Sequence, residues 1–351
     1  MKRRTYLTTA GALGATALAG CTGFTGGGEP SGTLTVATYP SLVDSDGAAG
    51  PWLKDQFESQ YPDATVEFST PDSGLNYYIQ RAKEGVPIEA DVYVGLNVDH
   101  LLRLDTELDD TLFDTVDDLA RREEVKEQLE FDPKGRAVPY DTGYISLVYD
   151  ESSVENPETF DALTTEAYAD TLIVENAQSS ATGRAFLLWT VNTLGEENYL
   201  DYWKQLDANG MTVLGSWEDA YNAYSNGEKP MVVSYSTDQV YANRYDQDMA
   251  RHQIGFLNDQ GYANPEGMAR FADAGDPELA KAFMAFVLTP DAQGEIAVRN
   301  VQFPATPDAE LTEEFATYAK EPPEPVTFTY EDLQGNVDGW VEDWAREIAQ
   351  G

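Results

Sequence analysis

Residues 33–96 alternate between two hydrophobic patterns. Three segments rich in β-branched residues predict strands, at residues 33–39 (TLTVATY), 64–69 (ATVEFS) and 90–96 (ADVYVGL). Two segments between them repeat apolar residues at helical spacing and predict helices, at residues 50–61 and 75–85. Strands that alternate with amphipathic helices predict a parallel sheet with crossover helices.

The same order returns later in the chain. Further strands are predicted at residues 144–150, 171–176, 211–216 and 230–236. Further helices are predicted at residues 183–195, 217–228 and 277–290. The sequence therefore predicts an α/β fold with two lobes, residues 33–139 plus 263–351 forming lobe 1 and residues 140–262 forming lobe 2. The chain is expected to cross a hinge at 137–144 and to return near 261–271, which leaves a cleft between the lobes.

The N-terminus carries an export pattern. Basic residues at positions 2–4 precede a small, apolar stretch at 7–19 that is too short to span a bilayer of ~30 Å. Residues 3–7 (RRTYL) resemble a twin-arginine export signal, and residues 18–21 (LAGC) resemble a lipobox. We expect a signal peptide at 1–20 and a flexible tether at 21–32 that begins with a lipidated Cys21, the one cysteine of the chain. The alternative is an ordinary cleaved signal with an unmodified cysteine.

The charge is strongly negative. The chain has 62 Asp and Glu against 22 Lys and Arg, for a net charge of −40. This excludes non-specific nucleic-acid binding, which requires positive charge. Either the acids attract cations or they keep the protein soluble in concentrated salt; their spread along the whole chain favours a halophile surface. Because the Debye length is only ~3 Å at 1 M salt, a ligand must then be held by direct contact.

Aromatic and polar residues at strand ends are the candidate ligand contacts. The predicted ring contacts follow strands or open helices: Tyr39, Trp217, Tyr235 and Tyr241. Aromatic faces attract organic cations, although rings at these positions also pack as the rim of a core. Ser180, Thr182 and Gly183 precede or open a helix whose free N–H groups either bind an anion or are simply capped. The remaining polar candidates are Asp72, Asn97 and Asp141.

Motifs of common enzymes are absent from the sequence. It contains no HExxH, GxSxG, P-loop or CxxC motif. Two histidines distant in sequence are too few for a zinc site. We therefore expect no catalytic residue, no metal and no cofactor.

Several segments carry a resemblance to a known family. The chain resembles the substrate-binding proteins of ABC transporters, and among these the thiamine-binding family, at residues 35–41, 90–96, 138–150, 179–189, 216–224, 232–241 and 303–308. The resemblance implies a two-lobed, periplasmic-binding-protein-like fold of type II that captures thiamine or its phosphates. It implies ring contacts from Tyr39, Trp217, Tyr235 and Tyr241, and a contact of Ser180 and its neighbours with the phosphate or hydroxyethyl end.

The resemblance also implies partners and a location. The protein would be a monomer at the outer face of the cell membrane, held there by the lipid on Cys21, and would deliver its ligand to an ABC transporter permease. Two positions differ from the family pattern. An acid follows the first tyrosine in the family, where this chain has Pro40, and a family tryptophan is replaced within Val301, Gln302 and Phe303.

Three other functions stay open at this stage. The same fold binds Fe(III) through paired tyrosines, for which Tyr235 and Tyr241 are the candidates. A secreted hydrolase would need two cleft carboxylates about 5–9 Å apart. An adhesive or structural surface protein would need neither a cleft nor a ligand.

Overall fold

The computed structural model describes residues 30–348 apart from 45, 46 and 110. The predicted signal peptide, Cys21 and most of the predicted tether lie outside this range. None of the helices in the described part combines the length and the apolar character needed to cross a membrane.

The described strands form one mixed sheet in the order β2-β1-β3-β9-β4-β7-β5-β6, to which β8, β10 and β11 add at the sides. The strands are β1 (Gly32–Ala37), β2 (Ala64–Ser69), β3 (Val92–Leu96), β4 (Ala137–Tyr149), β5 (Leu172–Glu175), β6 (Thr212–Leu214), β7 (Met231–Tyr235), β8 (Gln253–Gly255), β9 (Gln260–Arg270), β10 (Phe303–Pro304) and β11 (Glu324–Val326). β1 pairs in parallel with β2 and β3, and β5 pairs in parallel with β6 and β7. The predicted parallel order is thus confirmed in two groups of strands, β1–β3 and β5–β7. Between these groups, β4 is antiparallel to β7 and β9, and β9 is antiparallel to β3 and β4 but parallel to β11.

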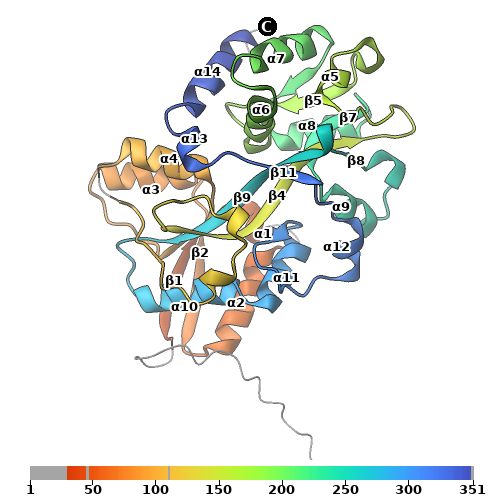
Figure 1. Cartoon of the computed structure of the whole chain (residues 1–351). Coiled ribbons are helices and arrows are strands. Elements are labelled where there is room, and N and C mark those ends of the chain that lie inside the picture. The colour runs from red at the N-terminus through yellow and green to blue at the C-terminus, as the bar shows by residue number, and fades with distance from the viewer. Residues whose placement is uncertain (1–29, 45–46, 110, 349–351) are drawn as a thin grey trace, which may run out of the picture.

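Helices cover both groups of strands (Figure 1). They are α1 (Pro40–Asp44), α2 (Ala49–Gln60), α3 (Leu75–Lys83), α4 (Val98–Glu107), α5 (Phe160–Leu163), α6 (Ala181–Leu194), α7 (Tyr199–Ala208), α8 (Trp217–Ser225), α9 (Asp238–Arg244), α10 (Pro277–Val287), α11 (Pro290–Arg299), α12 (Glu313–Tyr318), α13 (Tyr330–Leu333) and α14 (Val337–Glu347). Their apolar faces pack on the sheet as the sequence pattern predicts; α2, for example, buries Leu53 and Phe57.

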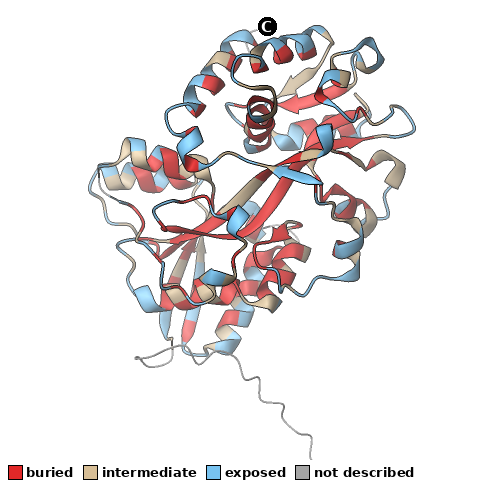
Figure 2. Cartoon of the chain, in the orientation of Figure 1, coloured by how far each residue is buried: buried red, intermediate tan, exposed pale blue. Residues whose placement is uncertain are grey.

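Two long antiparallel strands, β4 and β9, connect the two groups (Figure 1). Both are buried along much of their length (Figure 2), and all thirteen residues of β4 are buried. Their pairing is interrupted by a bulge after Pro139, a position where proline is tolerated because it has no N–H to donate. The predicted hinge crossing and return crossing therefore correspond to β4 and β9. The two-lobed α/β class is confirmed, and the predicted lobe boundaries fall inside these strands.

The C-terminal helix packs on the group that contains α7. Trp344 of α14 meets Trp203 of α7 edge to face, with ring centroids 5.4 Å apart. The indole N–H of Trp203 donates to Thr190 Oγ1 at 2.9 Å, so this fully buried ring leaves no polar atom unpaired. Aromatic pairs of this geometry contribute about 0.5–1.5 kcal/mol beyond area burial. The end of the chain, which the sequence assigns to lobe 1, thus also contacts a helix of predicted lobe 2.

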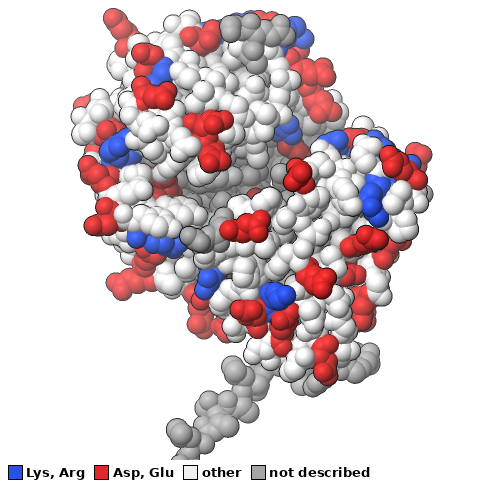
Figure 3. Space-filling view, turned by 180° about the vertical axis from the view of Figure 1, so that it is seen from behind, with Lys and Arg blue, Asp and Glu red and all other residues white. Residues whose placement is uncertain are grey.

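Carboxylates are scattered over the surface in Figure 3 and do not gather in one patch. Many of the few cations are held in surface ion pairs, such as Lys281 with Asp118 at 3.0 Å. Exposed pairs of this kind each contribute about 0–1 kcal/mol. Surface electrostatics therefore identify no binding face, and the ligand site must be sought among buried contacts.

Candidate functional site

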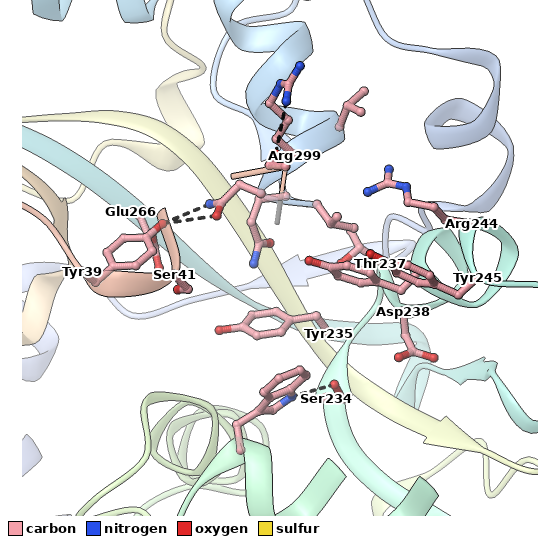
Figure 4. Close-up of a pocket in the computed structure, with 17 residues that line it drawn as sticks. Tyr39, Ser41, Ser234, Tyr235, Thr237, Asp238, Arg244, Tyr245, Glu266 and Arg299 are labelled. Carbon is pink, nitrogen blue, oxygen red and sulfur yellow. Dashed lines mark hydrogen bonds between the residues drawn. The ribbon is translucent and has the colours of Figure 1, made fainter. Parts of the chain in front are cut away.

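A cavity of about 770 Å³ lies where the ends of several elements meet beside the hinge strands. It is lined by Tyr39, Ser41, Gly47, Trp217, Ser234, Tyr235, Thr237, Asp238, Tyr241, Arg244, Tyr245, Glu266, Val298, Arg299, Asn300, Val301 and Gln302. Figure 4 shows Tyr39 and Glu266 at one end, Arg244 and Tyr245 at the other, and Tyr235 between them. The volume is in the range of pockets that enclose small organic ligands.

Two of the rings lie directly on glycines. A Cβ atom at Gly95 would be 2.5 Å from the Tyr39 ring, and the φ of +101° at Gly95 also favours glycine. A Cβ atom at Gly143 of β4 would be 2.5 Å from the Tyr235 ring. Both rings therefore approach the backbone at these positions more closely than a side chain would allow.

Trp217 is held by one hydrogen bond and one stacked ring. It is the first residue of α8, whose N-terminus is capped by the Ser216 side chain. Its indole N–H donates to Ser234 Oγ at 3.0 Å, and its ring stacks on Tyr221 with centroids 5.1 Å apart and planes 26° apart. The Trp217 ring is nevertheless 39% exposed. It is thus a fixed ring with one face available to a ligand.

A chain of buried polar groups supports this stacked pair. The Tyr221 hydroxyl donates to Asp238 Oδ1 at 2.5 Å, and Asp238 Oδ2 lies 2.7 Å from His252 Nδ1. Asp238 and His252 are both buried. Asp238 therefore fixes the position of Tyr221, and through it that of Trp217, while also lining the cavity.

At the end of the cavity where Figure 4 shows Arg244 and Tyr245, Tyr241 stacks on Tyr245. Their ring planes are 7° apart and their centroids are 6.3 Å apart. The Arg244 guanidinium lies 5.8 Å from the Tyr241 centroid and pairs with Glu314 at 3.2 Å. Arg299 pairs with Glu295 at 2.7 Å. Both arginines that line the cavity thus already have a carboxylate partner.

The other end of the cavity is a hydrogen-bonded floor between β4, β9 and the end of α11. The Tyr140 and Tyr39 hydroxyls donate to Glu266 Oε2 at 2.7 and 3.2 Å. Asn300 Nδ2 donates to the Tyr39 hydroxyl at 3.1 Å and to Asp141 Oδ2 at 2.8 Å. Asp141 of β4 and Glu266 of β9 lie opposite each other in the register of the two paired strands.

The surroundings of Asp141 and Glu266 raise the pKa values of both carboxyl groups. Burial, followed by the charge of Glu266, raises the pKa of Asp141 well above its usual value, and the Asn300 hydrogen bond opposes this only in part. Burial also raises the pKa of Glu266, although the Tyr140 and Tyr39 hydrogen bonds lower it. A cation placed beside them would favour their charged forms, so the floor is suited to a positively charged or N–H-rich ligand.

The structure brings four of the ten predicted site residues to the cavity wall: Tyr39, Trp217, Tyr235 and Tyr241. Asp141 does not line the cavity; it is fully buried behind the wall and accepts a hydrogen bond from Asn300, which does line it. The other five do not line this cavity either. Asp72 is exposed in a turn, and Asn97 caps α4 by accepting from the His100 N–H.

Ser180, Thr182 and Gly183 lie at the start of α6. Ser180 Oγ accepts from the Gly183 N–H at 3.4 Å and lies 2.8 Å from Thr182 Oγ1. A Cβ atom at Gly183 would be 2.5 Å from the Glu175 carbonyl oxygen, so this glycine lets α6 pack closely on the end of β5. In this arrangement the two hydroxyls have structural partners, and their predicted ligand contact stays a prediction.

Sequence reasoning missed the residues that complete the cavity, including Glu266, Asn300, Gln302 and Asp238. Glu266 is one of 62 acids and lies in a strand with no alternating pattern, so nothing in the sequence singles it out. Asn300 and Gln302 come directly after α11. They are far along the chain from Tyr39 and Tyr235, so the sequence does not indicate that all four line the same cavity. The resemblance had marked the segment around Gln302 as a departure from the family, which was the one available signal.

Burial raises the pKa of both Tyr235 and Tyr241, the two candidates for Fe(III) ligation. Within the described part of the chain, no group of three or more His, Cys, Asp or Glu side chains could hold a metal ion.

Two α/β lobes joined by a pair of hinge strands, with an aromatic cavity beside the hinge, define the class of hinged solute-binding proteins. The chain belongs to the family of bacterial extracellular solute-binding proteins, whose sequence profile matches residues 52–323. The curated relatives and solved structures reported below include solute-binding proteins as well.

The chain is similar to thiamine-binding periplasmic proteins. It is 27% identical to that of Salmonella typhimurium over 90% of this chain and 94% of the relative, and 28% identical to that of Brucella suis over 89% and 91%. Its fold is similar to that of a periplasmic thiamin binding protein, with a TM-score of 0.76 and 25% identity over 92% of this chain and 98% of the other. A ferric binding protein from Campylobacter jejuni shares the fold alone, with a TM-score of 0.71 and 15% identity over 90% and 99%.

Proposed function

We propose that this protein captures thiamine or a thiamine phosphate in the aromatic cavity and delivers it to an ABC transporter permease. The observation that carries the proposal is the convergence of Tyr39, Trp217, Tyr235 and Tyr241 on one cavity whose floor holds two carboxyl groups. A thiazolium cation gains about 0.5–2 kcal/mol from each ring face it contacts. The similarity to thiamine-binding proteins supports the same ligand.

Capture would follow from closure of the two lobes, which β4 and β9 connect, around the ligand. The open lobes admit the ligand, the rings stack on it, and the closed surface is the one that the permease recognises. The protein performs no chemistry on its ligand in this mechanism.

The anchoring part of the proposal rests on the sequence. Export through the twin-arginine route and lipidation of Cys21 would hold a monomer at the outer face of the cell membrane. Cys21→Ser should then release the protein from the membrane fraction into the medium. Retention of the Cys21→Ser protein in the membrane fraction would refute lipidation at this residue.

The ligand is tested by titrating the purified protein with thiamine in molar salt, following tryptophan fluorescence. Saturable quenching at micromolar or tighter affinity is expected. Thiamine monophosphate, measured in parallel, compares the phosphorylated form. A folded sample that responds to neither compound refutes the proposal, and a visible tyrosinate–iron colour on adding Fe(III) would favour the iron-binding alternative.

A further inference from the structure

The two lobes also meet at a seam outside the ligand cavity. The first residues of α4, which follows β3, and of α6, which follows β5, come together there beside β9. The space between them is a cavity of only about 30 Å³, close to the volume of one water molecule. It shares no lining residue with the ligand cavity. The lobes are therefore nearly in contact at this seam.

An ion pair crosses the seam. Arg184 Nη1 of α6 donates to Asp99 Oδ2 of α4 at 2.9 Å, and the two side chains are 31% and 21% exposed. Because both side chains are partly buried, salt screens this pair less than it screens the fully exposed pairs of the surface. The pair therefore keeps more of its attraction in molar salt than an exposed pair does.

Each member of the pair is positioned by its own lobe. Arg184 Nε donates to the Ala177 carbonyl at 3.2 Å, which fixes the guanidinium on the loop before α6. Asp99 lies in the first turn of α4, where the helix dipole favours a carboxylate. The other oxygen of this carboxylate, Oδ1, is buried and has no hydrogen-bond partner among the described residues. The pairing of Asp99 in the described structure thus depends on Arg184.

The C-terminal segment contacts both sides of the same seam. Thr327 and Phe328 line the small cavity, and Asn192 of α6 donates to the Thr327 carbonyl at 3.3 Å. The Tyr330 hydroxyl of α13 donates to Asp105 of α4 at 2.5 Å, and Figure 1 shows α13 between α4 and α14. A rotation of the lobes about β4 and β9 that separates α4 from α6 must therefore break the ion pair and displace this segment.

We propose that Asp99 and Arg184 form an interlobe latch, which holds the two lobes in the arrangement seen in the structure and opens when the lobes part. The latch lies outside the ligand cavity, so it acts on binding only through the position of the lobes. Removing the pair should populate more open arrangements, from which a bound ligand leaves faster. The latch itself does not depend on which solute is bound; its effect on thiamine release rests on the proposed function.

Small-angle X-ray scattering of the full-length purified protein without ligand measures the opening of the lobes. Asp99→Asn and Arg184→Gln each remove one charge of the pair, and a double variant removes both. All three should increase the radius of gyration by the same amount, because the two residues act as a unit. A thermal unfolding midpoint close to that of wild type shows that each variant is folded.

Asp114→Asn is the matched control. It breaks an ion pair of 2.8 Å with Arg270, which lies in β9 where that strand pairs with β3, so both partners are on one side of the hinge. The radius of gyration of this variant should equal that of wild type. An expansion of the control equal to that of the latch variants would show a general effect of lost charge and would overturn the latch.

Thiamine release is followed in the same proteins by stopped-flow fluorescence. The dissociation rate should rise about two- to fivefold in the three latch variants, the range expected for the loss of one ion pair near the surface. The rate should be unchanged in Asp114→Asn. Because neither Asp99 nor Arg184 lines the ligand cavity, a faster release reports on the lobes and not on a lost ligand contact.

The outcomes separate the latch from the proposed function. A radius of gyration equal to that of wild type in all three folded variants overturns the latch. Expansion in only one of the single variants, or additive expansion in the double variant, shows that the two residues do not act as a pair. Expansion without faster thiamine release overturns the effect of the latch on binding. If thiamine does not bind the folded wild-type protein, the proposed function fails, and the scattering result alone decides the latch.

Discussion

Glu175 is a buried acid whose replacement should change how stability depends on pH. It is the last residue of β5, is fully buried, and has no hydrogen-bond partner for either carboxyl oxygen among the described residues. Burial raises its pKa from 4.5 to about 8. We therefore expect Glu175 to be protonated in the folded protein at neutral pH.

The magnitude follows from the shift. A carboxyl group whose pKa is higher in the folded state contributes its full stability below the unfolded value of 4.5, and this is lost as pH rises through about 8. Each pH unit in that window is equivalent to about 1.4 kcal/mol. The folded protein should thus lose about 3 kcal/mol between pH 4.5 and pH 7 through this one group, and about 4 kcal/mol by pH 8. Glu175→Gln cannot ionise and should lose none of it.

Urea unfolding at pH 5, 6, 7 and 8, followed by tryptophan fluorescence, measures this difference. The free energy of unfolding of Glu175→Gln relative to wild type should increase steadily with pH. Contributions from Asp141 and Glu266 are common to both proteins and cancel. Glu228→Gln, which removes an exposed glutamate, is the matched control and should run parallel to wild type. A difference between Glu175→Gln and wild type that stays constant from pH 5 to pH 8 would refute the reasoning.

Three further predictions concern the cavity. Trp217→Ala should weaken thiamine binding about tenfold, because it removes a ring face worth roughly 1 kcal/mol and its Ser234 bond; calorimetry showing unchanged affinity would exclude Trp217 from the site. Gly143→Ala places a methyl group 2.5 Å from the Tyr235 ring and should lower affinity at least tenfold, whereas Gly339→Ala, which has open space around it, should bind as wild type. Asp238→Asn weakens the hydrogen bonds to Tyr221 and His252 and should lower the free energy of unfolding by about 1–3 kcal/mol. Thermal unfolding measures this, and a midpoint equal to that of wild type would contradict the role of Asp238 in holding Tyr221.

The regular elements of the fold could be predicted because their patterns are local. The predicted helix at residues 50–61 and α2 agree within one residue at each end, and the predicted strand at 64–69 is β2. β9 has no such local pattern, because its sequence QGYANPEGMAR contains two glycines, a proline and few apolar residues. It is a strand because β3 and β4 pair with it on both sides, and that tertiary pairing is invisible in the segment itself.

The candidate site likewise contains residues that local sequence patterns predict and residues that only tertiary pairing brings in. The four rings were predictable because loops at the carboxyl ends of parallel strands converge on one edge of a sheet. Glu266 and Asn300 were not predictable, because they reach the cavity from the return strand and from the end of α11. Their role depends on the antiparallel pairing of Asp141 with Glu266, which no residue pattern specifies.

The strong negative charge and the buried site can be understood together. A net charge of −40 spread over the surface attracts every cation alike and cannot by itself select one. In concentrated salt of about 1 M, interactions between exposed charges would be screened within ~3 Å, whereas buried groups such as Asp141 would be screened far less. Selectivity therefore has to come from groups that solvent does not reach: ring faces held by glycines and hydrogen bonds, and acceptors in the floor. This explains why the sequence's many acids revealed so little about the site, although two of them form its floor.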